Sequence, residues 1–334
     1  MEHMKNKIEI IAEVAQGFEG DKKLASLLTQ GAIASNADAV KFQLVYADEL
    51  ATPDYQHYQL FKNLEMQQNI WVEICKQIHN ADKKVYFDVF GLHSLEVARK
   101  LDADGVKLST TEFYNNALFD KAIAQFNNIY LSVGGIPIED IDKKLSVLNS
   151  EQMDTVCLMY GFQSEPTPVE QNNLNKLRLL KQRYPSFKIG FMDHSDGGLD
   201  DAFHLSLVAL GVGVDSIEKH ITLDRELKIE DYISGITPDN FVAFVNLINR
   251  FEPALGIDTL DLTDLEKEYR SKATKSVVAM CNLNAGDIIT QDMVALKRSS
   301  QPLTHDSILE LKDVIGKKLN TNILMNAPIT KSNI

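Results

Sequence analysis

Two strand-like runs of this sequence end in histidine, and these histidines are the first candidates for chemistry. The runs are Ile189–His194 and Ser216–His220, about one β-α unit apart in the chain. Because consecutive strands of an α/β fold end at the same edge of the sheet, we expect the two imidazoles to lie beside each other. Imidazole and oxygen ligands together suit Mn²⁺, Mg²⁺ or a similar divalent ion such as Co²⁺. Without a tight motif such as HExxH, the residues leave open that His194 and His220 are ordinary polar residues at strand ends.

Carboxylates at other strand ends extend this candidate site. Glu13 closes the first predicted strand and Glu112 follows the fourth. Partial burial raises the pKa of a carboxyl group toward neutrality, which suits a general acid or base. The alternative is a solvated loop carboxylate or an ion-pair partner. Further carboxylates are candidates for orienting the histidines or adding metal ligands, namely Asp193, Glu218 and Asp231.

Residue alternation along two further strands places lysines inside a barrel. In Ala39–Leu44 the apolar residues take one face, so Lys41 and Gln43 take the inner one. The same parity points Lys107 inward, and Ser132 ends the fifth strand before two glycines. Inward lysines in an acidic protein favour an anion site for phosphate or carboxylate. Lysines paired with glutamates for structural reasons, and a plain tight turn at Ser132, are the alternatives.

Eight short β-branched or aromatic runs alternate with segments of helical periodicity, which predicts a (β/α)8 barrel. The predicted strands are Ile8–Ala15, Ala39–Val45, Lys84–Phe90, Gly105–Ser109, Asn128–Gly135, Thr155–Gly161, Lys188–His194 and Asp215–Thr222. The predicted helices include Lys22–Ser35, Asn69–Ala81, Ser94–Leu101, Glu170–Tyr184 and Pro238–Glu252. A doubly wound open sheet is the competing fold, but no GxGxxG follows the first strand.

The pattern changes after residue 255. We expect a catalytic barrel over residues 1–255, a polar linker over 256–275 and a small β-rich module over 276–334, with a helix-like piece at Ser307–Val314. A module of this size is near the lower limit for an independent core. We therefore expect it to dock on a barrel, which can belong to a partner subunit.

Composition limits the partners and the compartment. The net charge is −13 and no basic cluster is long enough to follow a phosphate backbone, so we do not expect nucleic-acid binding. The three cysteines lie far apart, which is typical of reduced thiols in a cytoplasmic protein. Glu9 and Glu13 interrupt the apolar run that follows Lys5 and Lys7, so we expect no signal peptide and no membrane span.

Taken together, the motifs resemble the sialic acid synthase family, whose members have a barrel followed by an antifreeze-like (β-clip) domain. The resemblance covers nearly the whole chain. The motifs are Ile11–Gly17, Val40–Gln43, Val106–Glu112, Leu131–Gly134, Gly161–Pro168, Gly190–Ser195 and Ile217–Arg225. It implies a metal-dependent condensation of phosphoenolpyruvate with an open-chain N-acetylated aldose, which gives a nine-carbon 2-keto acid and phosphate. It also implies a domain-swapped homodimer.

The resemblance implies a role for each candidate residue. His194 and His220 would bind the metal, usually Mn²⁺, and Glu13 and Glu112 would handle protons. The residues implied to hold phosphoenolpyruvate are Lys41, Lys107, Thr110 and Ser132. Those implied to contact the sugar are Gln43, Gln163, Asp231 and, from the antifreeze-like domain of a second chain, Arg298. The implied sugar is like N-acetylmannosamine; a legionaminate- or pseudaminate-type synthase and a catalytically silent sugar- or phosphate-binding barrel are the alternatives.

Four departures from the family pattern concern the choice of substrate. Asp88 follows the third strand where the family has Ser or Thr, and Ser109 and Thr111 stand where it has two glycines around a serine. Glu165 replaces a tyrosine, and Ile229-Glu230 replaces Gly-Pro. An aspartate beside a phosphate is unfavourable unless it is paired.

Overall fold

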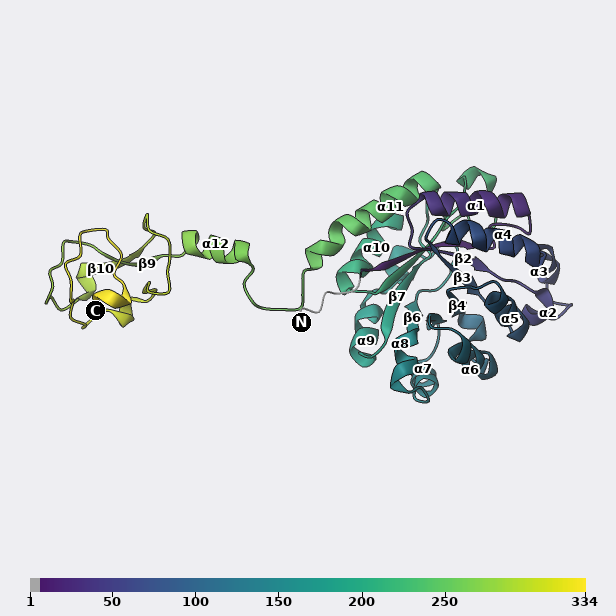
Figure 1. The fold of residues 1–334 in the computed structure, drawn as a ribbon, viewed down its shortest axis with the longest axis horizontal. Helices are drawn as coiled ribbons and strands as arrows, with labels where there is room; N and C mark the ends of the chain where they lie inside the picture. The colour runs from purple at the N-terminus through teal and green to yellow at the C-terminus, as the bar shows by residue number, and fades with distance from the viewer. Residues whose placement is uncertain (1–6) are drawn as a thin grey trace. The chain divides into compact units, whose positions relative to one another are not determined.

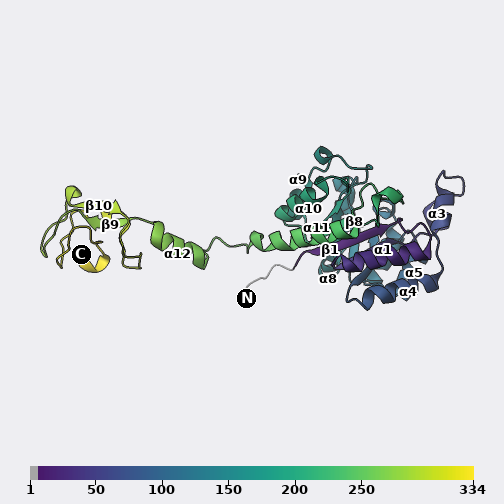
Figure 2. The same ribbon diagram turned by 90° about the horizontal axis from the view of Figure 1, so that it is seen from above.

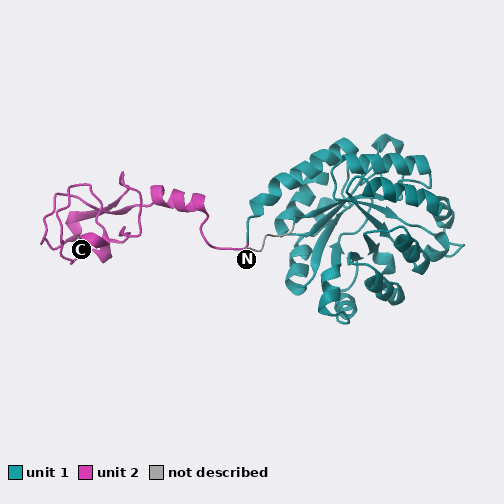
Figure 3. Cartoon of the chain, in the orientation of Figure 1, with its two compact units in different colours: residues 1–257 teal, residues 258–334 magenta. Residues whose placement is uncertain are grey.

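The computed structural model describes residues 7–334 and divides the chain into two compact units, Met1–Ile257 and Asp258–Ile334 (Figure 3). Lys5, named above in the argument against a signal peptide, lies outside the described residues. Within them, no helix combines the length and the apolar composition needed to cross a membrane.

The first unit is a closed barrel of eight parallel strands, which confirms the predicted (β/α)8 fold (Figures 1 and 2). The strands are β1 (Glu9–Ala15), β2 (Ala39–Gln43), β3 (Lys84–Asp88), β4 (Gly105–Leu108), β5 (Ile129–Ser132), β6 (Val156–Tyr160), β7 (Lys188–Asp193) and β8 (Ser216–His220). Each strand pairs in parallel with the next, and β8 closes the ring on β1. All eight therefore end at one mouth.

Helices surround the strands in Figure 1 and bury their apolar faces against the outward-facing strand residues. The α-helices are α1 (Lys22–Ala34), α2 (Ala47–Leu50), α3 (Tyr58–Leu64), α4 (Gln68–His79), α5 (Leu92–Lys100), α6 (Asn116–Gln125), α7 (Ile138–Leu145), α8 (Ser150–Thr155), α9 (Asn175–Arg183), α10 (Asp201–Val212) and α11 (Pro238–Phe251). The start predicted for α9 at Glu170 is wrong. Asn173 has a φ of 44°, a left-handed conformation that an α-helix cannot contain.

The interior of the barrel is filled in layers. At its N-terminal end Glu9 accepts hydrogen bonds from the hydroxyls of Tyr86 (2.7 Å) and Tyr130 and pairs with Lys84 (2.8 Å). An apolar layer follows, formed by Ile11, Ala39, Tyr86, Tyr130, Cys157, Met159 and Met192. Such packing makes the interior a core and not a pore. Polar chemistry is therefore confined to the upper layers, near the mouth.

The second unit has a core of its own around β9 (Ser276–Ala279) and β10 (Val294–Lys297), which pair antiparallel. Its buried residues are Val277, Ala279, Leu283, Ile289, Val294, Ile308, Val314, Leu319, Ile323 and Ile329. The residues expected to form a polar linker contain a helix that we did not predict, α12 (Asp264–Ala273).

The prediction of a helix-like piece at Ser307–Val314 is wrong. Only a short 3₁₀ turn, Leu311–Asp313, is present. The backbone of this segment forms β-type hydrogen bonds instead of helical ones, since Val277 N donates to Ile308 O at 2.9 Å and Ser307 forms a β-bridge with Thr330.

Candidate active site

The two histidines lie together at the mouth of the barrel. His220 ends β8 and His194 directly follows β7, and their ring centroids are 5.0 Å apart. Among residues 7–334, the buried Nδ1 atom of each ring finds no hydrogen-bond partner. Burial lowers the pKa of His194 to about 4 and that of His220 well below its ordinary value. Both rings are therefore neutral near pH 7, which is the form that binds metal ions.

The surroundings fit a metal ion that takes only two protein ligands. Two neutral imidazoles with unpartnered nitrogens are suitable donors. Among the described residues, however, no group of three or more His, Cys, Asp or Glu side chains is arranged to hold a metal. Glu218 is engaged by Lys107 at 2.6 Å, and Asp193 faces Lys219. Of the two roles expected for these carboxylates, their ion pairs suit orienting the histidines, and an ion held by the two imidazoles would keep positions for water and substrate.

A buried ion pair behind the histidines ties their strands together. Asp193 on β7 and Lys219 on β8 are register partners on the side of the strands that faces α10, with Oδ1 and Nζ 3.3 Å apart. Asp193 also accepts hydrogen bonds from the hydroxyls of Ser195 (2.6 Å) and Ser206 on α10 (2.8 Å). Each partner of the pair precedes one histidine. The pair therefore fixes the relative position of the two imidazoles.

The low histidine pKa values predict how stability depends on pH. Below pH 6.5 an unfolded histidine takes up a proton, whereas His194 in the folded chain does so only near pH 4. Stability should therefore fall as the pH drops from about 6.5 toward 4, by up to about 3 kcal/mol for His194, with His220 acting in the same direction. Urea unfolding at pH 7 and pH 5 measures this. A double variant His194→Gln/His220→Gln should lose most of the difference; an unchanged difference would contradict the assignment.

Below the histidines lies a layer of five buried charged residues, Glu13, Lys41, Asp88, Lys107 and Glu218. Lys41 Nζ contacts a Glu13 carboxylate oxygen and lies 2.5 Å from Asp88 Oδ1 and 3.6 Å from Glu218 Oε2. Lys107 Nζ lies 2.6 Å from Glu218 Oε1 and 3.7 Å from Asp88 Oδ2. The two lysines that the sequence placed inside the barrel do point inward, but both are already paired with carboxylates.

The five charges form one electrostatic unit. Burial alone would raise the pKa of Glu218, but Lys107 and Lys41 lower it to about 2. Burial alone would lower the pKa of Lys107, but Asp88 and Glu218 hold it above its ordinary value. Burial lowers the pKa of Lys41, against the opposite effect of Asp88 and Glu218. The formal charges of the three carboxylates and two lysines sum to −1. Asp88, which sequence reasoning noted only as a departure, is a central member of this unit.

Amide and carboxylate side chains form a polar rim above this layer. Gln43 Oε1 accepts a hydrogen bond from Gln16 Nε2 at 2.7 Å. Gln163 Nε2 donates to Asp231 Oδ1 at 2.9 Å and to Glu165 Oε1 at 3.2 Å. Burial raises the pKa of Asp231. A cavity of about 150 Å³ is lined by Gln163, Glu165 and the segment Lys228–Ser234.

The remaining candidates from the sequence lie on the loops after β4 and β5. Glu112 is buried, accepts a hydrogen bond from Asn115 at 2.8 Å, and has a pKa raised by burial. Thr110 Oγ1 donates to Gly134 O at 3.1 Å, and Ser132 contacts Met192. Gly134 is required here because a Cβ atom on it would lie 1.8 Å from the carbonyl oxygen of Gly161. No ion pair or hydrogen bond links Glu112 to the charged layer within residues 7–334.

The structure adds one rim residue that sequence reasoning did not single out, Gln16. It was part of a quoted motif, but its contact with Gln43 depends on the pairing of β1 with β2. Arg298 lies in the second unit, is exposed, and donates its Nε–H to Ala273 O at 2.9 Å.

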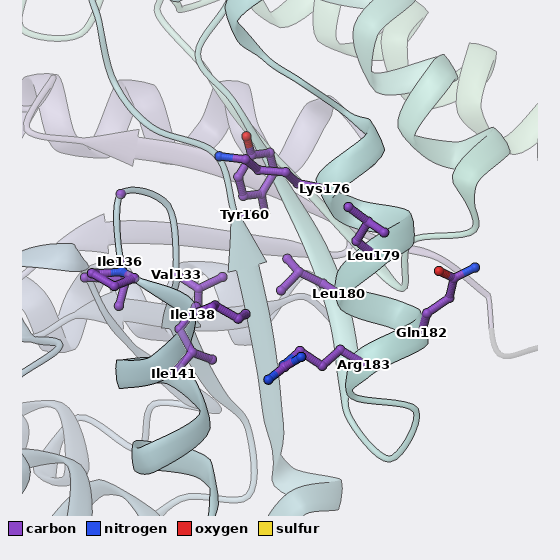
Figure 4. A pocket seen from close by; sticks show the side chains of 12 residues that line it. Val133, Ile136, Ile138, Ile141, Tyr160, Lys176, Leu179, Leu180, Gln182 and Arg183 are labelled. Atoms are coloured by element: carbon purple, nitrogen blue, oxygen red, sulfur yellow. The ribbon is translucent and has the colours of Figure 1, made fainter.

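A cavity of about 750 Å³ on the outside of the barrel contains none of these residues. It is lined by apolar side chains of α7 and α9 together with Tyr160, Lys176 and Arg183 (Figure 4). Tyr160 follows the inward-facing Met159 on β6 and therefore faces away from the barrel axis. The polar chemistry of the mouth is separate from this cavity.

A barrel with buried charges and paired neutral histidines at the C-terminal ends of its strands belongs to the class of (β/α)8 enzymes. The family model described as "NeuB family" matches residues 28–259, which is more than half of the chain, and a SAF domain model matches residues 274–334. The chain belongs to the NeuB family and carries a C-terminal SAF, or antifreeze-like, domain. This confirms the resemblance found in the sequence.

Relatives are similar over most of the chain. The N,N′-diacetyllegionaminic acid synthase of Campylobacter jejuni is 26% identical over 95% of this chain and 97% of its own length. The pseudaminic acid synthase of the same species is 25% identical over 95% of this chain and 94% of its own. The crystal structure of the N-acetylneuraminic acid synthetase of Leptospira borgpetersenii has a TM-score of 0.74 and 25% identity, over 80% of this chain and 93% of that one. The chain is therefore an enzyme of the nonulosonate synthase type.

Proposed function

We propose that this enzyme condenses phosphoenolpyruvate with an N-acetylated aldose to give a nine-carbon 2-keto acid and phosphate. The observation that carries the proposal is the stacking of the His194–His220 pair above the Lys41–Lys107 layer in one barrel mouth. Cationic groups suit an anionic donor, and neutral imidazoles suit a metal ion. The names of the similar synthases support the same reaction class.

Each group has a role in this proposal. Lys41 and Lys107, with Thr110 and Ser132, hold the donor, so that its C3 faces the aldehyde carbon of the sugar. A divalent ion held by His194 and His220, most simply Mn²⁺, would supply Lewis-acid polarisation of the aldehyde oxygen. Glu13 and Glu112 move protons as water adds at C2 of the donor and phosphate leaves; their burial suits that work.

The sugar is proposed to bind at the polar rim. Gln43, Gln163 and Asp231 offer the hydrogen-bond donors and acceptors that hydroxyl and acetamido groups require. N-acetylmannosamine is the first candidate, and deoxy-diacetamido sugars of the legionaminate or pseudaminate routes are the second. The presence of Glu165 at this rim, 3.2 Å from Gln163, favours testing both.

Arg298 is proposed to complete the sugar site from a second copy of the chain, in a domain-swapped homodimer. Its guanidinium has donors beyond the one used on Ala273. Light scattering of the full chain, together with the activity of mixed dimers of Arg298→Ala and His220→Ala chains, tests this. Mixing should restore part of the turnover that each variant lacks if each site combines residues of two chains.

The reaction itself is tested by phosphate release. We expect the full chain to release phosphate from phosphoenolpyruvate only when Mn²⁺ and an N-acetylated aldose are both present, and EDTA to stop the release. A panel of N-acetylmannosamine and deoxy-diacetamido aldoses identifies the acceptor. Tight binding of sugar and donor by calorimetry, without phosphate release for any acceptor, would instead indicate a catalytically silent binding barrel.

A further inference from the structure

We propose that Asp88 is an internal anion that competes with the donor's charged group for Lys41 and Lys107, and so determines which anions the barrel accepts. This inference rests on the proposed function only in taking the lysine pair as the anion site. It assigns Asp88 a role in anion selection at that pair.

The geometry places Asp88 between the two lysines. It ends β3, the strand between β2 and β4, and its register partners are Gln43 and Lys107. Its two carboxylate oxygens divide between the ammonium groups, Oδ1 at 2.5 Å from Lys41 and Oδ2 at 3.7 Å from Lys107. Its side chain is only 3% exposed. A carboxylate bridging two lysines in this way holds the position that an oxyanion would otherwise take.

The layer holds three carboxylates for two lysines. Lys41 Nζ donates to Asp88 Oδ1 and Lys107 Nζ donates to Glu218 Oε1, while Glu13 also contacts Lys41. A neutral residue at position 88 would leave two carboxylates for the two lysines. With Asp88 the formal charges of the five buried side chains sum to −1. A free anion entering the layer therefore meets lysines that are already occupied and a field that repels it. Only an anion with additional contacts elsewhere in the mouth can displace the internal carboxylate.

The inference is tested with inorganic phosphate as the probe and the full chain as the protein. In isothermal titration calorimetry at pH 7 we expect Asp88→Asn to bind phosphate at least about tenfold more tightly than the unmodified chain. The formal charge of the layer becomes zero, and both ammonium groups lose one carboxylate partner and can contact phosphate instead. The matched control Asp88→Glu keeps the charge and should remain a weak phosphate binder. Asp88→Ser, which also removes the charge, should behave like Asp88→Asn. Thermal unfolding of each variant establishes that it is folded.

Several outcomes would overturn the inference. Phosphate affinity that stays unchanged or falls in a folded Asp88→Asn or Asp88→Ser chain would do so, as would tighter binding by Asp88→Glu. If neither neutral variant folds, Asp88 is a structural counterion and the inference also fails. The proposed function is judged separately. If the unmodified chain turns over the donor but Asp88→Asn shows unchanged phosphate affinity, only the inference is wrong. If no acceptor gives turnover but Asp88→Asn binds phosphate more tightly, only the proposed function is wrong.

Discussion

Replacing His220 or His194 by alanine is expected to lower kcat/KM for phosphate release by about 10²–10³-fold or more. In the proposed site each histidine would be one of two protein ligands of the metal ion, because the described residues hold no group of three or more His, Cys, Asp or Glu side chains that could bind one. Loss of either imidazole should therefore weaken Mn²⁺ binding as well as turnover. Steady-state kinetics and calorimetry with Mn²⁺ measure the two effects independently.

The chain offers a matched control in His204, which lies on α10 and is exposed. His204→Ala should leave Mn²⁺ affinity and turnover within error of the unmodified chain. If His194→Ala retained both Mn²⁺ affinity and turnover, the assignment of the histidine pair would be wrong.

Replacing Lys107 by methionine is expected to have the largest effect on stability, a loss of about 3–5 kcal/mol in the free energy of unfolding, together with loss of turnover. Methionine keeps most of the side-chain volume but leaves Glu218 and Asp88 short of a cation inside the barrel. An unpaired buried carboxylate is costly because nothing replaces its lost hydration. Urea unfolding and phosphate release measure the two effects.

A second substitution separates stability from chemistry. Lys107→Met/Glu218→Gln removes the orphaned charge and should recover a large part of the lost stability without restoring turnover. If turnover returned together with stability, Lys107 would be a scaffold residue and not part of the donor site. If Lys107→Met were fully stable, the charged layer would not be coupled in the way its distances indicate.

The fold could be predicted from the sequence because its signals are local. Most of the eight strands are short runs rich in β-branched or aromatic residues, and alternation within Ala39–Gln43 was enough to point Lys41 inward. The capping box at Thr263 and Glu266 is a local signal of the same kind, and it was overlooked when α12 was taken as linker. The helix predicted at Ser307–Val314 was wrong for the opposite reason. Its helical periodicity is a local signal, but β contacts with distant residues determine the structure of this segment.

The site could be predicted only in part, because its contacts cross the barrel. Strand ends and parity bring His194, His220 and the lysines to one mouth. The partners of those lysines depend on closure of the ring: Lys107 on β4 meets Glu218 on β8, 111 residues later. No spacing in the sequence indicates that a carboxylate from the third strand lies between two lysines. The sequence therefore identified Asp88 as an unusual residue, but it did not predict that its carboxylate lies between Lys41 and Lys107.

The filled floor of the barrel has a consequence for the order of events during turnover. Glu9, Tyr86 and Tyr130 seal the N-terminal end, so everything must enter and leave through the mouth. The charged layer lies beneath the histidines and the polar rim. If the lysines hold the donor as proposed, the donor must bind before the sugar above it, and the phosphate formed at the lysines leaves only after the sugar acid has departed.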